Sequence, residues 1–253
     1  MKKIVLVSSS LLICSILLAQ PNKTTAAPPK NNAHLKVFYQ AINSGDINSS
    51  ITALNYYIAD QGSNTPYTDT LAMLYMQQGS YAQSFYWADQ RLRTKPEDNG
   101  LLEIKGYSLD KLQQPKEAIA VFEKLYGKTQ NPFHAYKLME LQYGIKRLAE
   151  CVATANSAER LQFKPEYVMT YNVGDQTGRT YLQAGVYNIH ALALYDLDQK
   201  AEAKTYFAKA VALDSNFVLA RQNLAAVIAA EKDPAKVNSN TPNQTANPGN
   251  KQN

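Results

Sequence analysis

The segment QKAEAKTYFAKAVALDSN, residues 199–216, decides the fold. Within it Ala203, Phe207 and Ala210 are spaced four and three residues apart, and Leu213 follows before a turn-like Asp-Ser-Asn. This spacing puts the four residues on one face of an amphipathic helix. Small residues hold two of these places, as a helix requires where another helix comes very close. We expect Ala203 and Ala210 to face the preceding helix, and Phe207 and Leu213 to fill the gap to the following one.

The same pattern recurs upstream at intervals of 34 residues. A turn residue followed five places later by a small residue occurs at 45–50, at 79–84 and at 113–118. The preceding helix of each unit also has a small residue at a fixed place. The residues that mark the repeat are Gly45, Ala72, Gly79, Gly106, Ala118, Phe122, Ala191, Ala203, Phe207 and Ala210.

This pattern resembles the tetratricopeptide-repeat (TPR) family, whose unit is a helix, a tight turn and a second helix in 34 residues. The units are expected at 31–64, 65–98, 99–132, 133–166 and 184–217, followed by a capping helix at 217–232. The resemblance implies an all-α, right-handed solenoid of about five helical hairpins over residues 33–232. Stacking of neighbouring units then buries a continuous core that no unit has alone.

The fourth unit departs from the pattern. In strict phase its small places fall on Glu140 and Val152, whereas a shift of three puts Gly144 in the turn and Ala149 on the close-packed face. We expect the shifted phase. An insertion at about 167–183 then precedes the fifth unit, and it is expected either to lengthen two helices or to form a protruding loop.

The two ends of the chain differ in composition from the repeats. Residues 1–19 begin with two lysines and continue as an apolar stretch, which is typical of a secretory signal peptide. The stretch is shorter than the roughly 20 residues that span a membrane, and Cys14 lacks the small preceding residue of a lipoprotein. We therefore expect a periplasmic or secreted protein with no membrane span after signal cleavage. Residues 20–32 are expected to be a flexible linker and 233–253 a disordered polar tail.

The sequence gives little sign of chemistry. The formal net charge is +5, but there is no run of Lys and Arg, so nothing indicates a nucleic-acid partner. The three histidines, His34, His134 and His190, are too far apart in sequence for a pair of metal ligands on one helix. No nucleophile, phosphate-binding or Cys-x-x-Cys motif occurs. We expect no catalytic residue, no metal and no cofactor.

The resemblance implies that function lies in a concave groove lined by the first helices of successive units. In this family the groove holds an extended peptide or a helix of another protein. The residues counted onto it are Tyr39, Met73, Met76, Tyr107, Asp110, Lys111, Leu192 and Tyr195, with Leu138 and Leu141 as candidates from the fourth unit. An apolar, aromatic floor suits a hydrophobic or aromatic segment. Asn is missing from the ninth place of the units, so the carboxylate clamp of some family members is not expected.

The expected function is that of a non-catalytic scaffold or adaptor for a protein or peptide partner, in cell-envelope assembly or secretion. A second hypothesis is a small-molecule binder or enzyme that uses the insertion at 166–182. It requires Asp175, Arg179 and His190 to converge in one pocket. A third is self-assembly through the open ends of the array. The tyrosines could also simply pack between helices, and the sequence leaves the oligomeric state open.

Overall fold

The computed structural model describes residues 32–232, which form eleven helices and one β-hairpin. The predicted signal peptide, nearly all of the linker and the polar tail lie outside these residues. No helix within 32–232 is long and apolar enough to cross a bilayer. The elements are α1 (Ala33–Asn43), α2 (Ile47–Gln61), α3 (Tyr67–Gln78), α4 (Tyr81–Leu92), α5 (Asn99–Lys111), α6 (Pro115–Thr129), α7 (Pro132–Gly144), α8 (Leu148–Ala158), β1 (Val168–Val173), β2 (Gln176–Tyr181), α9 (Leu182–Asp196), α10 (Lys200–Leu213) and α11 (Val218–Lys232).

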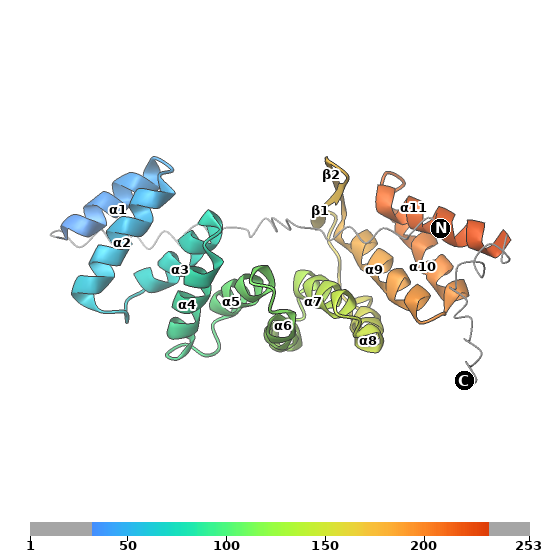
Figure 1. Ribbon diagram of the computed structural model, residues 1–253, viewed down its shortest axis with the longest axis horizontal. Helices are drawn as coiled ribbons and strands as arrows, with labels where there is room; N and C mark the ends of the chain where they lie inside the picture. The colour runs from blue at the N-terminus through green and yellow to red at the C-terminus, as the bar shows by residue number, and fades with distance from the viewer. Residues whose placement is uncertain (1–31, 233–253) are drawn as a thin grey trace, which may run out of the picture.

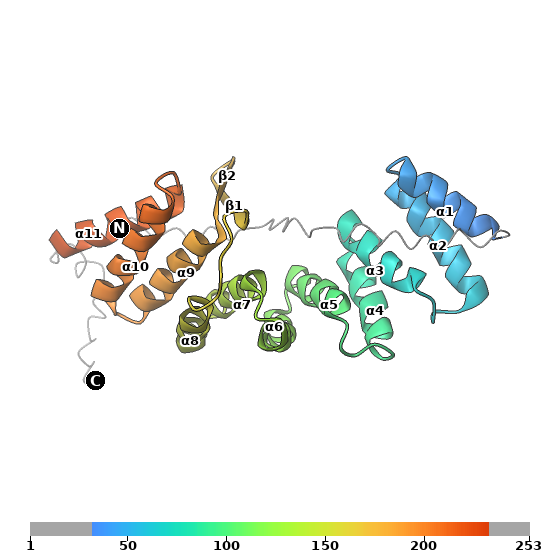
Figure 2. The ribbon, with the colours of Figure 1, turned by 180° about the vertical axis from the view of Figure 1, so that it is seen from behind.

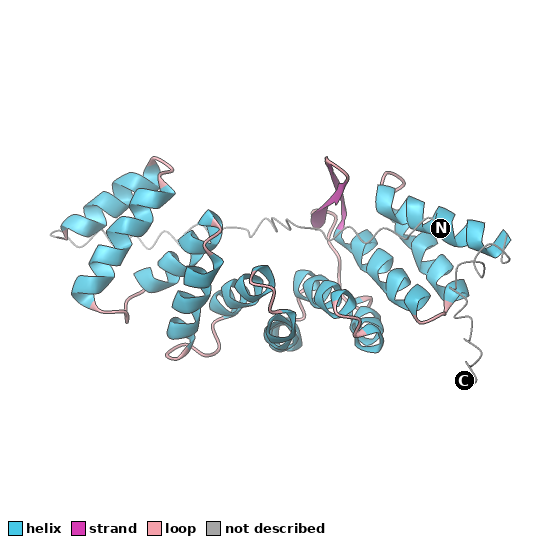
Figure 3. Cartoon of the chain, in the orientation of Figure 1, coloured by secondary structure: helices cyan, strands magenta, loops and turns pink. Residues whose placement is uncertain are grey.

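The helices form five successive hairpins, α1–α2 to α9–α10, and α11 packs on the last of them. Figures 1 and 2 show the hairpins following one another along an arc, with α1–α2 at one end and α10–α11 at the other. The first helices α5, α7 and α9 lie toward the inside of the arc. Figure 3 shows the hairpin β1–β2 as the non-helical element of the described chain. The predicted helical solenoid with a capping helix is therefore confirmed.

The turn inside every hairpin has the same backbone geometry. One residue is left-handed, and the N–H of the next residue bonds to the carbonyl five residues before it at 2.8–2.9 Å, which closes the end of the first helix. The left-handed residues are Gly45, Gly79, Gln113, Lys146 and Asp198. Their separations, 34, 34, 33 and 52 residues, define the phase of each unit.

This geometry corrects the predicted phase of the fourth unit. The left-handed residue is Lys146, whereas Gly144 is the last residue of α7 and Ala149 is exposed. Cys151 is fully buried at the close-packed place instead, and its Sγ lies 3.5 Å from the carbonyl of Met139. The shift is therefore one residue rather than three. Its cause is the α6–α7 connection, which is one residue shorter than the regular period.

The small residues lie where two helices approach most closely. Ala203, Phe207 and Ala210 have no exposed surface, and a Cβ atom on Gly106 would lie 2.8 Å from the ring of Phe122 in α6. The expectation for Leu213 was wrong, because 40% of that residue is exposed. Phe217, at the start of the next turn, is buried and fills the gap to α11.

The insertion forms an antiparallel hairpin rather than longer helices or an open loop. Its strands pair from Val168↔Tyr181 to Val173↔Gln176, and Gly174 adopts φ +58° in the two-residue turn. The hydroxyl of Tyr171 accepts from the N–H of Val218 at 3.1 Å. The hairpin is thereby fastened to the start of α11 as well as to α9.

The core has two parts. One apolar cluster extends from Leu35 to Leu74, and the other from Leu92 to Val227. Buried polar groups lie between them, because the Ser84 hydroxyl donates to the carbonyl of Ala72 at 2.9 Å and receives a hydrogen bond from Ser108 at 3.0 Å. Helices α3, α4 and α5 are thus joined by small residues and hydrogen bonds.

Candidate functional site

A cavity of about 450 Å³ lies on the inner side of the arc, between α7, α9 and α11. The end of α5 and strand β1 close it at the sides. Its apolar walls are built by Leu141, Ile145, Met169, Ile189, Leu192 and Phe217. A concave, mostly apolar space with a few polar groups is the usual form of a ligand site in proteins.

The β-hairpin forms one wall of this cavity because α9 has a glycine beneath it. The sulfur of Met169 occupies the space that a side chain on Gly185 would need, and the ring of Tyr136 would lie 3.0 Å from such a Cβ. Burial raises the pKa of the Tyr136 phenol well above its ordinary value, so the hydroxyl stays neutral. The hairpin and the glycine together hold two large side chains against the inner face.

A charged trio lies in the floor between α5 and α7. The Lys137 ammonium is 2.7 Å from both the Asp110 and the Glu140 carboxylates, and only 6% of its side chain is exposed. Burial by itself would lower the pKa of Lys137, but the charges of Glu140 and Asp110 and hydrogen bonds to both outweigh burial and raise it. The ammonium stays charged, and the trio has one net negative charge.

Two buried asparagines face each other across α9 and α11. The Nδ2 of Asn223 donates to the Oδ1 of Asn188 at 3.1 Å, and these residues are 5% and 6% exposed. Both border the cavity. The Nδ2 of Asn188 and the Oδ1 of Asn223 have no hydrogen-bond partner among residues 32–232, yet neither atom is sealed from solvent. The pair therefore offers one donor and one acceptor to a ligand.

The predicted groove residues divide between the cavity and other places. Asp110, Lys111 and Leu192 border the cavity. The Tyr39 hydroxyl lies 3.0 Å from that of Tyr67, a contact that joins α1 to α3.

Four more predicted groove residues are half-buried and do not border the cavity. Tyr107 packs edge-on against Phe122, with ring centres 5.1 Å apart. Met73 and Met76 are on α3, and Tyr195 is on α9.

Sequence reasoning missed Asn223, Lys137 and the two hairpin residues Met169 and Tyr171. A signal for the hairpin was present, since the turn pair Gly-Asp at 174–175 separates two runs rich in Val, Thr and Tyr. For Asn223 there was no signal beyond its place on the capping helix.

The residues required by the enzyme hypothesis do not converge. Asp175 and Arg179 are exposed on the hairpin, whereas His190 is fully buried, with Nδ1 2.9 Å from a carboxylate oxygen of Glu159. Burial lowers the pKa of His190 although Glu159 acts to raise it. No group of three or more His, Cys, Asp or Glu side chains within 32–232 is arranged to hold a metal ion.

The comparisons with known proteins agree with this architecture. Residues 184–217 match the family model described as "Tetratricopeptide repeat". None of the curated proteins matches the sequence. The chain is a tetratricopeptide-repeat protein by fold.

Solved structures of TPR proteins superimpose on most of the chain. MamA from Desulfovibrio magneticus RS-1 has a TM-score of 0.60 at 16% identity, covering 76% of this chain and 99% of that one. YrrB, described as "a TPR protein with an unusual peptide-binding site", has a TM-score of 0.60 at 13% identity, with 81% and 94% covered. A tetratricopeptide repeat protein from Parabacteroides merdae has a TM-score of 0.59 at 11% identity, with 80% and 74% covered. At these identities the likeness concerns the fold of this TPR chain.

Proposed function

We propose that the chain is a non-catalytic adaptor that binds an extended segment of a partner protein along its inner face. The observation that carries the proposal is the Asn188–Asn223 pair beside the apolar walls of the cavity. A peptide unit in an extended segment has a free N–H and a free C=O, whereas the middle of a helix has neither. The open donor and acceptor of the pair match an extended backbone.

The walls favour an apolar or aromatic side chain of that segment. Leucine, isoleucine, methionine and phenylalanine side chains surround a volume of about 450 Å³, and burying an apolar side chain there contributes about 1.5–3 kcal/mol. Lys137 is already bonded to Asp110 and Glu140. Recognition in the cavity therefore depends on shape and amide hydrogen bonds more than on a charge pair.

Photo-crosslinking in cells tests this proposal. A photoreactive residue replaces Leu219, which borders the cavity, and the matched control replaces Lys116, which is exposed on α6. We expect one discrete crosslinked protein from position 219 and none from 116. With the captured partner in hand, Asn223→Ala should weaken binding about tenfold, because a ligand amide then loses its partner. Equal labelling at both positions, or unchanged binding by Asn223→Ala, would contradict the proposal.

We also propose that the protein is exported to the periplasm or secreted and acts in envelope assembly or secretion. The support is the composition of residues 1–19, two lysines followed by an apolar stretch. Mass spectrometry of the protein from fractionated cells should give a mature chain that begins near residue 20. A full-length chain recovered in the cytoplasm would count against export.

A further inference from the structure

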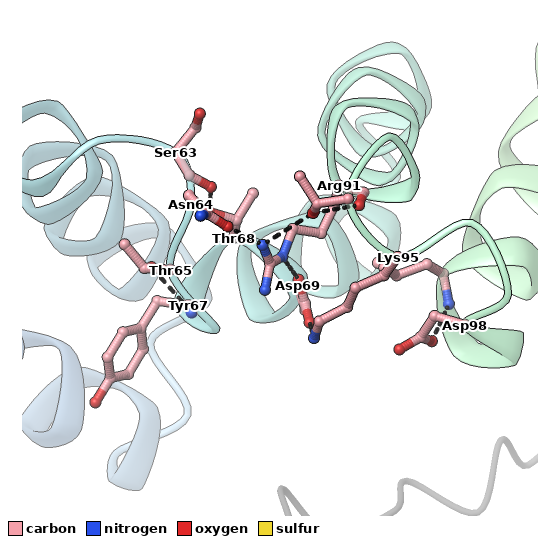
Figure 4. Close-up of polar contacts among 11 residues, drawn as sticks. Ser63, Asn64, Thr65, Tyr67, Thr68, Asp69, Arg91, Lys95 and Asp98 are labelled. Carbon is pink, nitrogen blue, oxygen red and sulfur yellow. Dashed lines mark hydrogen bonds and ion pairs between the residues drawn. The ribbon is translucent and has the colours of Figure 1, made fainter.

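Arg91 of α4 is a buried cation at the junction of two hairpins. It is 7% exposed, and its guanidinium passes beneath the α2–α3 loop (Figure 4). Its Nε lies 2.5 Å from the Oδ1 of Asp69 on α3, and its Nη1 donates to the Oδ1 of Asn64 at 2.7 Å and to the Thr94 hydroxyl at 3.3 Å. Two of the three guanidinium nitrogens are therefore occupied.

The remaining polar groups at this junction are donors. The Nη2 of Arg91 donates no hydrogen bond to any residue of 32–232, and the atom is not sealed from solvent. The Lys95 ammonium gives one hydrogen bond, to the Oδ2 of Asp69 at 2.8 Å, which leaves two of its three N–H groups. The Nδ2 of Asn64 has no partner in the same range. Two cations thus share one carboxylate.

Nearby carboxylates do not balance this charge, because each is engaged elsewhere. Asp98 accepts from a backbone N–H at the start of α5 at 3.0 Å. Asp89 lies 2.6 Å from Lys105, and Glu97 lies 2.7 Å from Lys124. The junction therefore keeps one net positive charge and several unfilled donors, which is the chemistry of an anion site.

We propose that Arg91 Nη2, Lys95 and Asn64 form a binding site for a carboxylate group of a partner protein. A guanidinium presents its donors in a planar fork that matches a carboxylate, and burial strengthens the interaction by lowering the local dielectric. The site uses a second helix and two loops, and it belongs to a different part of the fold from the cavity. That its occupant is a protein follows from the proposed function, but the site does not require the cavity to be filled.

Titration of the full-length chain labelled with ¹⁵N-arginine tests the site without knowledge of the partner. The Nε–H signal of Arg91, assigned with Arg91→Lys, is followed at constant ionic strength set with sodium chloride. The probes are N-acetyl-aspartic acid amide for a side-chain carboxylate, N-acetyl-alanine for a chain terminus, N-acetyl-asparagine amide as neutral control, and inorganic phosphate. We expect a saturating shift with one or both carboxylate probes, with an affinity of about millimolar. The stronger of the two identifies the source of the carboxylate.

Two substitutions separate the site from general charge effects. Lys95→Gln should weaken the carboxylate probe about threefold, as expected for one exposed charge pair. Arg93→Gln is the matched control, because 68% of the Arg93 side chain is exposed and it lies 4.0 Å from Asp89. It should leave the affinity unchanged. A shift that does not saturate, an equal shift with the asparagine probe, a response to phosphate alone, or no effect of Lys95→Gln would overturn the proposal. Failure of the Leu219 crosslink would leave this titration unaffected.

Discussion

Replacing Gly106 by alanine tests how closely α5 and α6 approach each other. A Cβ atom at this place would lie 2.8 Å from a ring carbon of Phe122 and 3.2 Å from a methyl of Val121, whereas non-bonded carbons prefer about 3.5–4.0 Å. Phe122 is fully buried, so its ring cannot withdraw without displacing its neighbours. Overpacking of this kind costs about 1–3 kcal/mol.

Gly127→Ala is the matched control. Gly127 is inside α6, and a Cβ there would meet nothing within 4 Å. Both substitutions gain the same helix propensity of about 1 kcal/mol, so the difference between the variants isolates the overlap at Gly106. In thermal melts followed by circular dichroism we expect Gly127→Ala to exceed the parent chain. Gly106→Ala should melt about 2–12 °C below the control variant. Equal stabilisation of both variants would refute the close approach of the two helices.

Three other changes have defined outcomes. Gln113→Gly should raise the urea midpoint by about 1 kcal/mol of stability, because a left-handed backbone is strained in any other residue type; a lower midpoint would contradict this. Lys137→Ala leaves Asp110 and Glu140 without their shared cation and should cost about 3 kcal/mol in the same assay. Burial lowers the pKa of His190 below its ordinary 6.5, so the unfolded chain binds this proton more tightly. Its contribution to stability is complete above pH 6.5 and is lost progressively as the pH falls below 6.5, and His190→Gln should flatten that slope.

The repeat architecture could be predicted because close helix packing limits the residues that fit. Small side chains at Ala203 and Ala210, and a glycine at Gly106, are needed wherever two helices approach closely, so their spacing identifies the unit. Glycine at 45 and 79 marks the turn, since glycine takes a left-handed backbone without strain. The hairpin escaped this reasoning because the insertion was considered only as a longer helix or a loop.

The candidate site could be predicted only in part. Counting along the repeat brought Asp110, Lys111 and Leu192 to the cavity. The hairpin wall depends on tertiary packing of Met169 over Gly185, which no repeat pattern encodes. The capping helix was expected only to close the array, so the contribution of Asn223 to the inner face could not be anticipated.

The phase of the fourth unit decides the chemistry of the floor. Successive helix residues are separated by about 100° around the axis, so an error of one place changes which side chains face the groove. In the predicted strict phase the ninth place is Leu141, whereas the observed turn at Lys146 makes it Glu140. Leu138 is then 3% exposed within the core, and Glu140 joins Lys137 in the cavity. A turn residue that is not glycine thus hides a charged trio inside a groove that its sequence presents as apolar.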